Sequence, residues 1–214
     1  MTFAARSAPQ KRVLNTGSGP YHADKLHPAF RGGDWKEVRL DIDPRVEPDV
    51  VGSVNDMRAF AADNSYDAIW SSHNVEHLHA HEVQPTFREF ARVLKPSGFA
   101  LITCPDLEIV ARLIADGKMD QVVYVSPAGP ITPLDMLFGH SASIASGNVY
   151  MAHNTGFTGD RLGRVGLDAG FREVRIARGT FGDIWALALM PTARLEDVAP
   201  LFRGTPQVGL VQRS

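Results

Sequence analysis

Short apolar runs alternate along this chain with amphipathic and turn-rich stretches. Six runs stand out, at 13–14, 38–42, 67–70, 99–103, 174–177 and 184–190. The first five predict buried strands, and the sixth is the longest of the set. Because the stretches between them carry helical spacing or turn residues, the alternation predicts a layered α/β domain with a mainly parallel sheet.

The clearest helix is predicted over 85–94. Its apolar residues recur at i, i+3, i+4 and i+7 and share one face; they are Phe87, Phe90, Ala91 and Leu94. We expect this helix to end at a turn over 95–98, where proline and glycine lead the chain into the next strand. A second helix is predicted over 160–169, capped by Asp160 and ended by Gly170.

Two segments depart from this regular alternation. Residues 107–155 are rich in glycine and proline in places and are weakly periodic, so we expect an insertion that covers the open edge of a pocket as a lid. Residues 1–10 have the composition of a flexible tail. With these elaborations, 1–214 is long enough for one domain with a substantial core.

Composition excludes several classes of protein. A formal net charge of -2 lacks the basic excess that a nucleic-acid backbone rewards, so no nucleic-acid partner is expected. The single cysteine, Cys104, excludes an intramolecular disulfide and fits a reducing compartment. No stretch has the length and apolarity of a membrane span or a signal peptide. We therefore expect a cytoplasmic protein without a membrane partner, and no oligomeric state is predicted.

A glycine turn follows the first predicted strand directly. Gly17 and Gly19 form this turn, and Asp41 ends the second strand about 20 residues later, the separation typical of a ribose-binding acid. A carboxylate there can accept hydrogen bonds from both ribose hydroxyls. Asp43 is a rival for this role, but the alternation of strand faces favours Asp41.

The cofactor predicted by this turn has one nucleoside and a short charged tail. A dinucleotide fingerprint requires a small residue three positions after Gly19, where this chain has His22. Pro20 also hinders a long pyrophosphate-binding helix. A plain strand-to-helix turn stays open as the alternative interpretation.

Four segments, taken in order, resemble the class I S-adenosylmethionine-dependent methyltransferases, in particular their compact type-11 group. They are VLNTGSG (13–19), VRLDIDP (38–44), YDAIWSSHNVEHL (66–78) and FARVLKPSGFALITCPD (90–106). The last segment is the most specific, because glycine-rich oxidoreductases lack a helix followed by LKPSG. A stretch over 153–176 resembles the same group less specifically. The resemblance implies a doubly wound, Rossmann-like sheet of seven strands with the last one antiparallel.

The resemblance also implies S-adenosyl-L-methionine as the cofactor. Gly17 and Gly19, with Ser18 between them, would let the backbone pass close to the adenosine and methionine portions. Asp41 would hold the ribose hydroxyls, and Ile42 would lie against the adenine ring.

Further residues of the implied cofactor site follow the later strands. Ser53 and Val54 would flank the adenine edge, whereas Ser72 and His73 would face the methionine end. The first motif of the group usually begins with an acid, and here it begins with Asn15, which offers no charge to the methionine ammonium. Ser53 likewise stands where many relatives have Asp.

Histidines gather over 73–81, which holds four of the eight in the chain. His73 or His77 could act as a general base or orient a water molecule. His77 and His81 have the i, i+4 spacing that can share a metal on a helix. Because the HExxH order is absent and no third ligand is evident, no metal is predicted.

Three further residues are candidates for substrate contacts. Asp106 follows the fourth strand, at the edge where such sheets bind ligands. Tyr150 and His153 lie at the end of the 107–155 segment, and an ordinary polar loop is the alternative there.

The resemblance implies methyl transfer to an oxygen or nitrogen of a small-molecule or glycan-like acceptor. The sulfonium methyl group is already electrophilic, so such an enzyme mainly aligns the nucleophile. A nucleoside-binding protein without transferase activity is the main alternative, motivated by Asn15 and Ser53. A nicotinamide oxidoreductase is disfavoured by His22 and by the LKPSG element.

Overall fold

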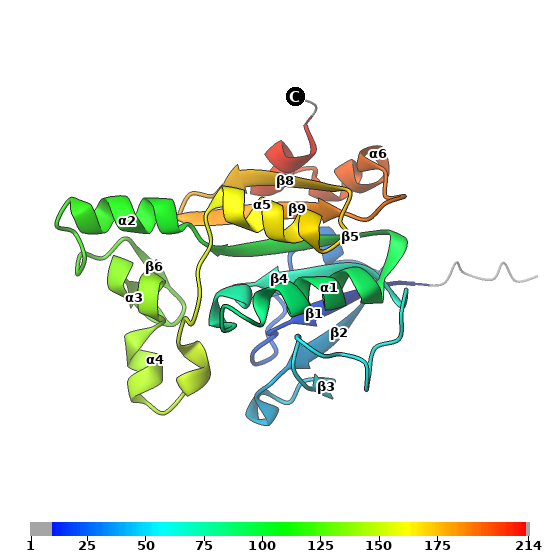
Figure 1. Cartoon of the computed structure of the whole chain (residues 1–214). Coiled ribbons are helices and arrows are strands. Elements are labelled where there is room, and N and C mark those ends of the chain that lie inside the picture. Colours follow the sequence, from blue (N-terminus) through cyan, green and yellow to red (C-terminus); the bar gives the residue numbers. More distant parts are fainter. Residues whose placement is uncertain (1–9, 213–214) are drawn as a thin grey trace, which may run out of the picture.

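A seven-stranded sheet forms the centre of the computed structural model, which describes residues 10–212 (Figure 1). Its spatial order is β3-β2-β1-β4-β5-β9-β8. β9 runs antiparallel to both neighbours, and the other neighbouring pairs are parallel. The strands are β1 (Lys11–Thr16), β2 (Trp35–Asp41), β3 (Val50–Val51), β4 (Tyr66–Ser72), β5 (Leu94–Pro105), β8 (Glu173–Arg178) and β9 (Asp183–Leu189). The predicted doubly wound, mainly parallel sheet is confirmed.

All six apolar runs coincide with strands, but the predicted turn over 95–98 is wrong. β5 begins at Leu94, where helix α1 (Val83–Val93) ends, and its pairing with β4 shifts register between Tyr66 and Ala68. This irregularity lets the LKPSG residues run on as strand. A Cβ on Gly98 would lie 2.9 Å from the carbonyl oxygen of Asp67, so glycine permits the close approach.

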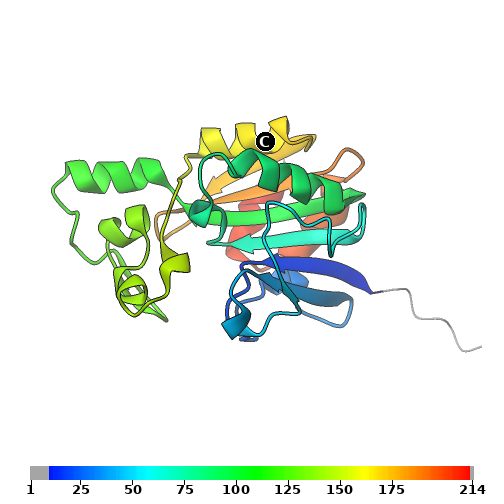
Figure 2. The ribbon, with the colours of Figure 1, turned by 60° about the horizontal axis from the view of Figure 1, so that its bottom comes forward.

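Two long helices lie together on one face of the sheet (Figure 2). They are α1 and α5 (Gly159–Asp168), and both were predicted. The cap of α5 differs from the prediction: the side chain of Thr158, not Asp160, accepts a hydrogen bond from the Arg161 amide. Gly170, with φ at +107°, follows the helix end as expected.

Short segments cover the opposite face. They are η1 (Pro28–Phe30), α6 (Leu195–Val198), η5 (Ala199–Phe202) and η6 (Pro206–Val211). Phe30 and Phe202 of this layer are buried in the main hydrophobic core. Within residues 10–212, no helix has the length and apolarity needed to cross a bilayer.

The segment 107–155 projects beyond the end of the sheet at which β5 stops (Figures 1 and 2). Its elements are α2 (Leu107–Ala115), β6 (Tyr124–Ser126), β7 (Gly129–Ile131), α3 (Pro133–Phe138), α4 (Ser141–Ala145) and η4 (Val149–Met151). Val110, Ile131 and Met136 form a small core of its own. The predicted tail over 1–10 lies, apart from Gln10, outside the described residues.

His27 joins η1 to the C-terminal layer. Its Nδ1 accepts a hydrogen bond from the Ala29 amide at 3.1 Å, so the ring proton is on Nε2, which lies 2.9 Å from Gln207 Oε1. Burial lowers the pKa of His27 below its usual 6.5. The folded chain therefore binds this proton less readily than the unfolded chain does.

Because the pKa of His27 is lowered in the folded chain, His27 makes the free energy of unfolding decrease as the pH falls. The contribution of His27 is fully present above pH 6.5 and is lost as the pH falls through its lowered pKa. We expect the unfolding free energy, measured with urea, to fall between about pH 7.5 and pH 5.5, and to fall less in His27→Gln. The exposed His22 provides the control, because His22→Gln should keep the parent slope. Equal slopes in all three proteins would contradict this assignment.

Candidate functional site

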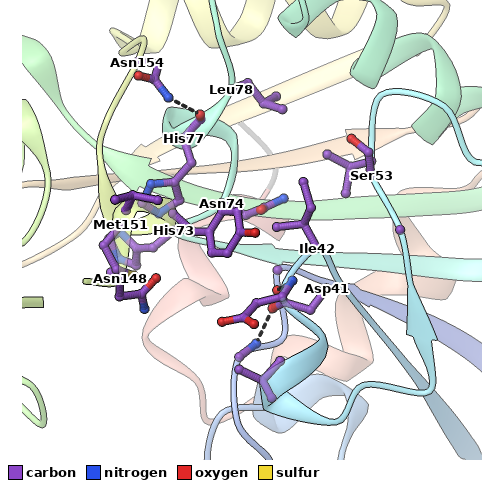
Figure 3. A pocket seen from close by; sticks show the side chains of 18 of the residues that line it. Asp41, Ile42, Ser53, His73, Asn74, His77, Leu78, Asn148, Met151 and Asn154 are labelled. Carbon is purple, nitrogen blue, oxygen red and sulfur yellow. Dashed lines mark hydrogen bonds between the residues drawn. The ribbon is translucent and has the colours of Figure 1, made fainter. Parts of the chain in front are cut away.

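A cavity of about 560 Å³ lies at the carboxyl ends of the strands, where the order of the sheet changes direction between β1 and β4 (Figure 3). Open α/β sheets bind their ligands at this point. The turn after β1, the end of β2 and the segment after β4 all contribute to its wall. Helix η3 (Val75–His77) and the residues around η4 close the wall on the other side.

The glycine turn is fixed by its surroundings. Gly17 and Gly19 have φ values of +64° and +59°, a region that favours glycine. A Cβ on Gly17 would lie 2.5 Å from Asn74 Oδ1, so no larger residue fits while Asn74 keeps its place. The turn can therefore bring backbone to the cavity only because both positions are glycine.

Asp41 binds the turn directly. Its Oδ2 accepts a hydrogen bond from the Gly19 amide at 2.8 Å (Figure 3). Its Oδ1 accepts one from the Asp43 amide at 2.9 Å. A carboxylate oxygen can accept more than one hydrogen bond, so both oxygens keep capacity for a ligand. The rival Asp43 differs, because Arg45 engages both of its oxygens.

Seven of the ten predicted cofactor residues line this cavity. They are Gly17, Gly19, Asp41, Ile42, Ser53, Val54 and His73. The Ile42 side chain is 51% exposed and stands at the cavity wall, an unusual placement for a large apolar group.

The other three predicted cofactor residues, Asn15, Ser18 and Ser72, line a second cavity of about 400 Å³. Gly17, Lys25 and His73 line both cavities, so the two meet at the turn. The side-chain amide of Asn15 donates a hydrogen bond from Nδ2 to Glu37 Oε1 at 2.7 Å.

His73 lines both cavities and is paired with a buried acid. Its backbone has φ at +47°, which is strained for histidine. Its Nδ1 lies 3.1 Å from Glu76 Oε1, and the Glu76 side chain is 1% exposed. Burial opposes charge on both groups, but their mutual hydrogen bond and attraction prevail, so the pKa of His73 is raised and that of Glu76 is lowered.

Sequence reasoning missed Glu76, Lys25 and Asn74. A signal for Glu76 was available, since it is the acid inside the 73–81 histidine segment. η3 is a single 3-10 turn that ends at His77, so the helical i, i+4 relation between His77 and His81 does not arise. Among residues 10–212, His77 is instead grouped with Glu76 and His153.

The three candidate substrate residues fall in different places. Tyr150 lines the first cavity. The His153 ring packs edge-on against His77, with ring centroids 4.9 Å apart. Asp106 lines neither cavity: it is fully buried, caps α2 through the Glu108 amide at 3.0 Å and pairs with Arg178 at 3.1 Å. These contacts give Asp106 a structural role.

Known proteins resemble this chain in sequence over one region and in fold over most of its length. Residues 29–102 match the family model described as a methyltransferase domain. No curated protein sequence matches the chain.

Solved structures of methyltransferases share the fold at low identity. A SAM-dependent methyltransferase from Archaeoglobus fulgidus has a TM-score of 0.53 and 15% identity, with 84% of this chain and 86% of that one covered. A SAM-dependent methyltransferase from Thermotoga maritima is described as a possible histamine N-methyltransferase. It has a TM-score of 0.54 and 13% identity, with 85% of this chain and 83% of that one covered. Phosphoethanolamine N-methyltransferase 2 from Haemonchus contortus, in complex with S-adenosyl-L-methionine, has a TM-score of 0.55 and 11% identity. The match covers 87% of this chain and 50% of that one.

The sequence match and the fold agree with one another. The matched region contains β2, β4, α1 and most of β5, and therefore much of the wall of the first cavity. Residues 29–102 thus match the methyltransferase-domain model, and most of the chain shares the fold of solved S-adenosyl-L-methionine-dependent methyltransferases.

Proposed function

We propose that this chain is an S-adenosyl-L-methionine-dependent methyltransferase that transfers the methyl group to an oxygen or nitrogen of a small-molecule or glycan-like acceptor. The observation that carries the proposal is the layout of the first cavity. It has a carboxylate and the glycine turn in one part of its wall, and His73, paired with Glu76, at the junction with the second cavity. A cofactor site and a proton acceptor thereby share one space.

The adenosyl portion of the cofactor is assigned to the Asp41 end. Asp41 would accept hydrogen bonds from the ribose hydroxyls while it continues to hold the turn. Ile42, exposed at the wall, would lose water-exposed apolar surface against the adenine ring. Ser53 and Val54 would border the same ring.

The methionine portion is assigned to the junction of the two cavities, beside Gly17 and His73. Lys25 lines both cavities, and its ammonium would pair with the methionine carboxylate. Burial lowers the pKa of Lys25, and a bound carboxylate would offset that effect. Asn15, Ser18 and Ser72 would supply polar contacts from the second cavity.

His73 is the proposed general base, with His77 as the second candidate. S-adenosyl-L-methionine supplies a methyl group that is already activated, so the chain must bind, orient and deprotonate the acceptor. Glu76 orients the His73 ring through Nδ1 and stabilises the imidazolium that forms when Nε2 takes the acceptor proton. His77 also lines the cavity, with its Nδ1 held 3.0 Å from the Ala152 carbonyl oxygen.

The segment 107–155 is proposed to act as a lid over this cavity. Asn148, Tyr150 and Met151 from its last part line the wall. Val149 and Tyr150 are large, exposed side chains there, with 65% and 45% of their surface accessible. A ligand in the cavity would bury part of this surface and hold the segment down.

Replacing Asp41 should weaken the binding of S-adenosylhomocysteine. Asp41→Asn keeps the side-chain size but removes the charge and one acceptor, so we expect a loss of about 1.5–3 kcal/mol by calorimetric titration. Asp43→Asn is the matched comparison and should lose much less, because Arg45 already engages that carboxylate. Equal losses in the two variants would reject the ribose assignment.

The lid predicts a local pattern of proteolysis. Thermolysin, which cleaves next to apolar residues, should cut near Val149, and S-adenosylhomocysteine should slow that cut because the neighbouring residues line the cavity. Cleavage near the exposed Val208, which lies outside the segment and is not part of the wall, is the internal control and should keep its rate. Uniform protection of both sites, or of neither, would speak against a lid.

Transferase activity is separable from cofactor binding. Methyl-labelled S-adenosyl-L-methionine should label members of a panel of hydroxyl- and amine-bearing small molecules and oligosaccharides. At saturating S-adenosyl-L-methionine, where a loss of cofactor affinity does not contribute, His73→Gln should lower that labelling by about 100-fold or more, the usual worth of a general base. Tight cofactor binding without any labelled product would instead favour a nucleoside-binding protein.

A further inference from the structure

Two histidines and a glutamate converge beside the first cavity. Glu76, His77 and His153 each offer one ligand atom, and these atoms all lie within 4.8 Å of one another. Glu76 and His77 belong to η3, whereas His153 follows η4 at the far end of the insertion. The cluster therefore joins the core of the domain to the segment that leaves the insertion.

The hydrogen bonds of both rings fix where their protons are. His77 Nδ1 lies 3.0 Å from the Ala152 carbonyl oxygen, and His153 Nδ1 lies 2.9 Å from the Met136 carbonyl oxygen. A carbonyl oxygen only accepts, so each Nδ1 carries the proton and donates it. Each neutral ring is left with a free lone pair on Nε2. Histidines that bind metals are held in this manner, by a backbone carbonyl on the other nitrogen.

The carboxylate of Glu76 has an unused oxygen. Oε1 is engaged by His73 at 3.1 Å, whereas Oε2 is buried without a hydrogen-bond partner among residues 10–212. A buried carboxylate oxygen without a partner is costly. The cluster therefore supplies three acceptors, Glu76 Oε2 and the two Nε2 atoms, which a cation could engage together.

We propose that Glu76, His77 and His153 bind a divalent metal ion, with Zn²⁺ as the ion that this donor set suits best. Two imidazole nitrogens and one carboxylate oxygen are ligands of zinc sites that keep one position open. No metal was predicted from the sequence, because His77 and His81 showed neither the HExxH order nor a third ligand. The fold instead brings His77 together with Glu76 and with His153 from the end of the insertion.

The open coordination position of the metal would give it a role in binding the methyl acceptor. His77 lines the first cavity, so a ligand on the metal would reach the space next to His73. A hydroxyl or carboxylate oxygen of the acceptor would be bound there and positioned for methylation. This consequence for the acceptor rests on the proposed function, whereas metal binding itself does not.

The direct test is titration of the chelator-treated, full-length protein with zinc chloride by calorimetry. We expect one ion per chain in the parent. Loss of one ligand in His153→Ala should weaken the affinity by about 100-fold or more, because even outer-sphere partners of a metal are worth 10–100-fold. Glu76→Gln should weaken it as well. The double variant of His79→Ala and His81→Ala is the control, since that stacked pair lies outside the cluster and should leave binding unchanged.

A second measurement guards against variants that fail to fold. Zinc should raise the thermal unfolding midpoint of the parent and of the control, but not that of folded His153→Ala. Absence of one-to-one binding in the parent, or equal affinity in His153→Ala, would overturn the site. S-adenosylhomocysteine titrated into the zinc-free protein separates the two proposals, because its failure to bind would reject the cofactor assignment and leave the metal result standing.

Discussion

The hydrogen bonds accepted by Asp41 hold the functional end of this molecule together. One carboxylate receives the amide of Gly19 from the turn after β1 and the amide of Asp43 from the segment after β2. The two loops are thereby fixed at the point where the sheet order changes direction. In the turn, Gly17 and Gly19 have positive φ angles, and Gly17 lies against the Asn74 side chain. A rigid rim of this kind lets the same carboxylate serve a ligand, because its position is set before the ligand arrives.

The part of the wall around His73 is built from segments that are distant in the sequence. η3 brings Glu76 inward under His73, and the amides of Asn154 and Thr155 both donate to the Glu76 carbonyl oxygen, at 2.9 and 3.1 Å. The chain that leaves the insertion is therefore attached to the wall of the cavity through its backbone. The proposed cofactor binding and proton transfer would therefore both depend on a wall that also anchors the proposed lid.

Much of the fold follows from the sequence because its strands are buried and its helices amphipathic. Burial on both faces gives β4 and β5 continuous apolar runs, and α1 shows a clear apolar face with Phe87 and Phe90. Local sequence patterns failed to predict the elements whose bounds depend on contacts between distant parts of the chain. β3 has two residues and no pattern of its own, and β5 extends through LKPSG because of a register shift with β4. Thr158 caps α5 one position before the helix, where sequence alone could not separate it from Asp160.

The candidate site divides in the same way. Gly17, Gly19, Asp41 and Ile42 lie near strand ends, so a pattern along the chain could place them. His153 joins Glu76 only because the insertion returns to the core, and no local spacing encodes that contact. Asp106 was placed correctly at a strand end, but its carboxylate is used by Arg178 and by the cap of α2.

A crystal structure of the complex with S-adenosylhomocysteine tests the central claim most directly. Our account predicts both ribose hydroxyls about 3 Å from the Asp41 carboxylate oxygens and the adenine ring against Ile42. A nucleoside bound elsewhere, or with its ribose out of reach of Asp41, would contradict it.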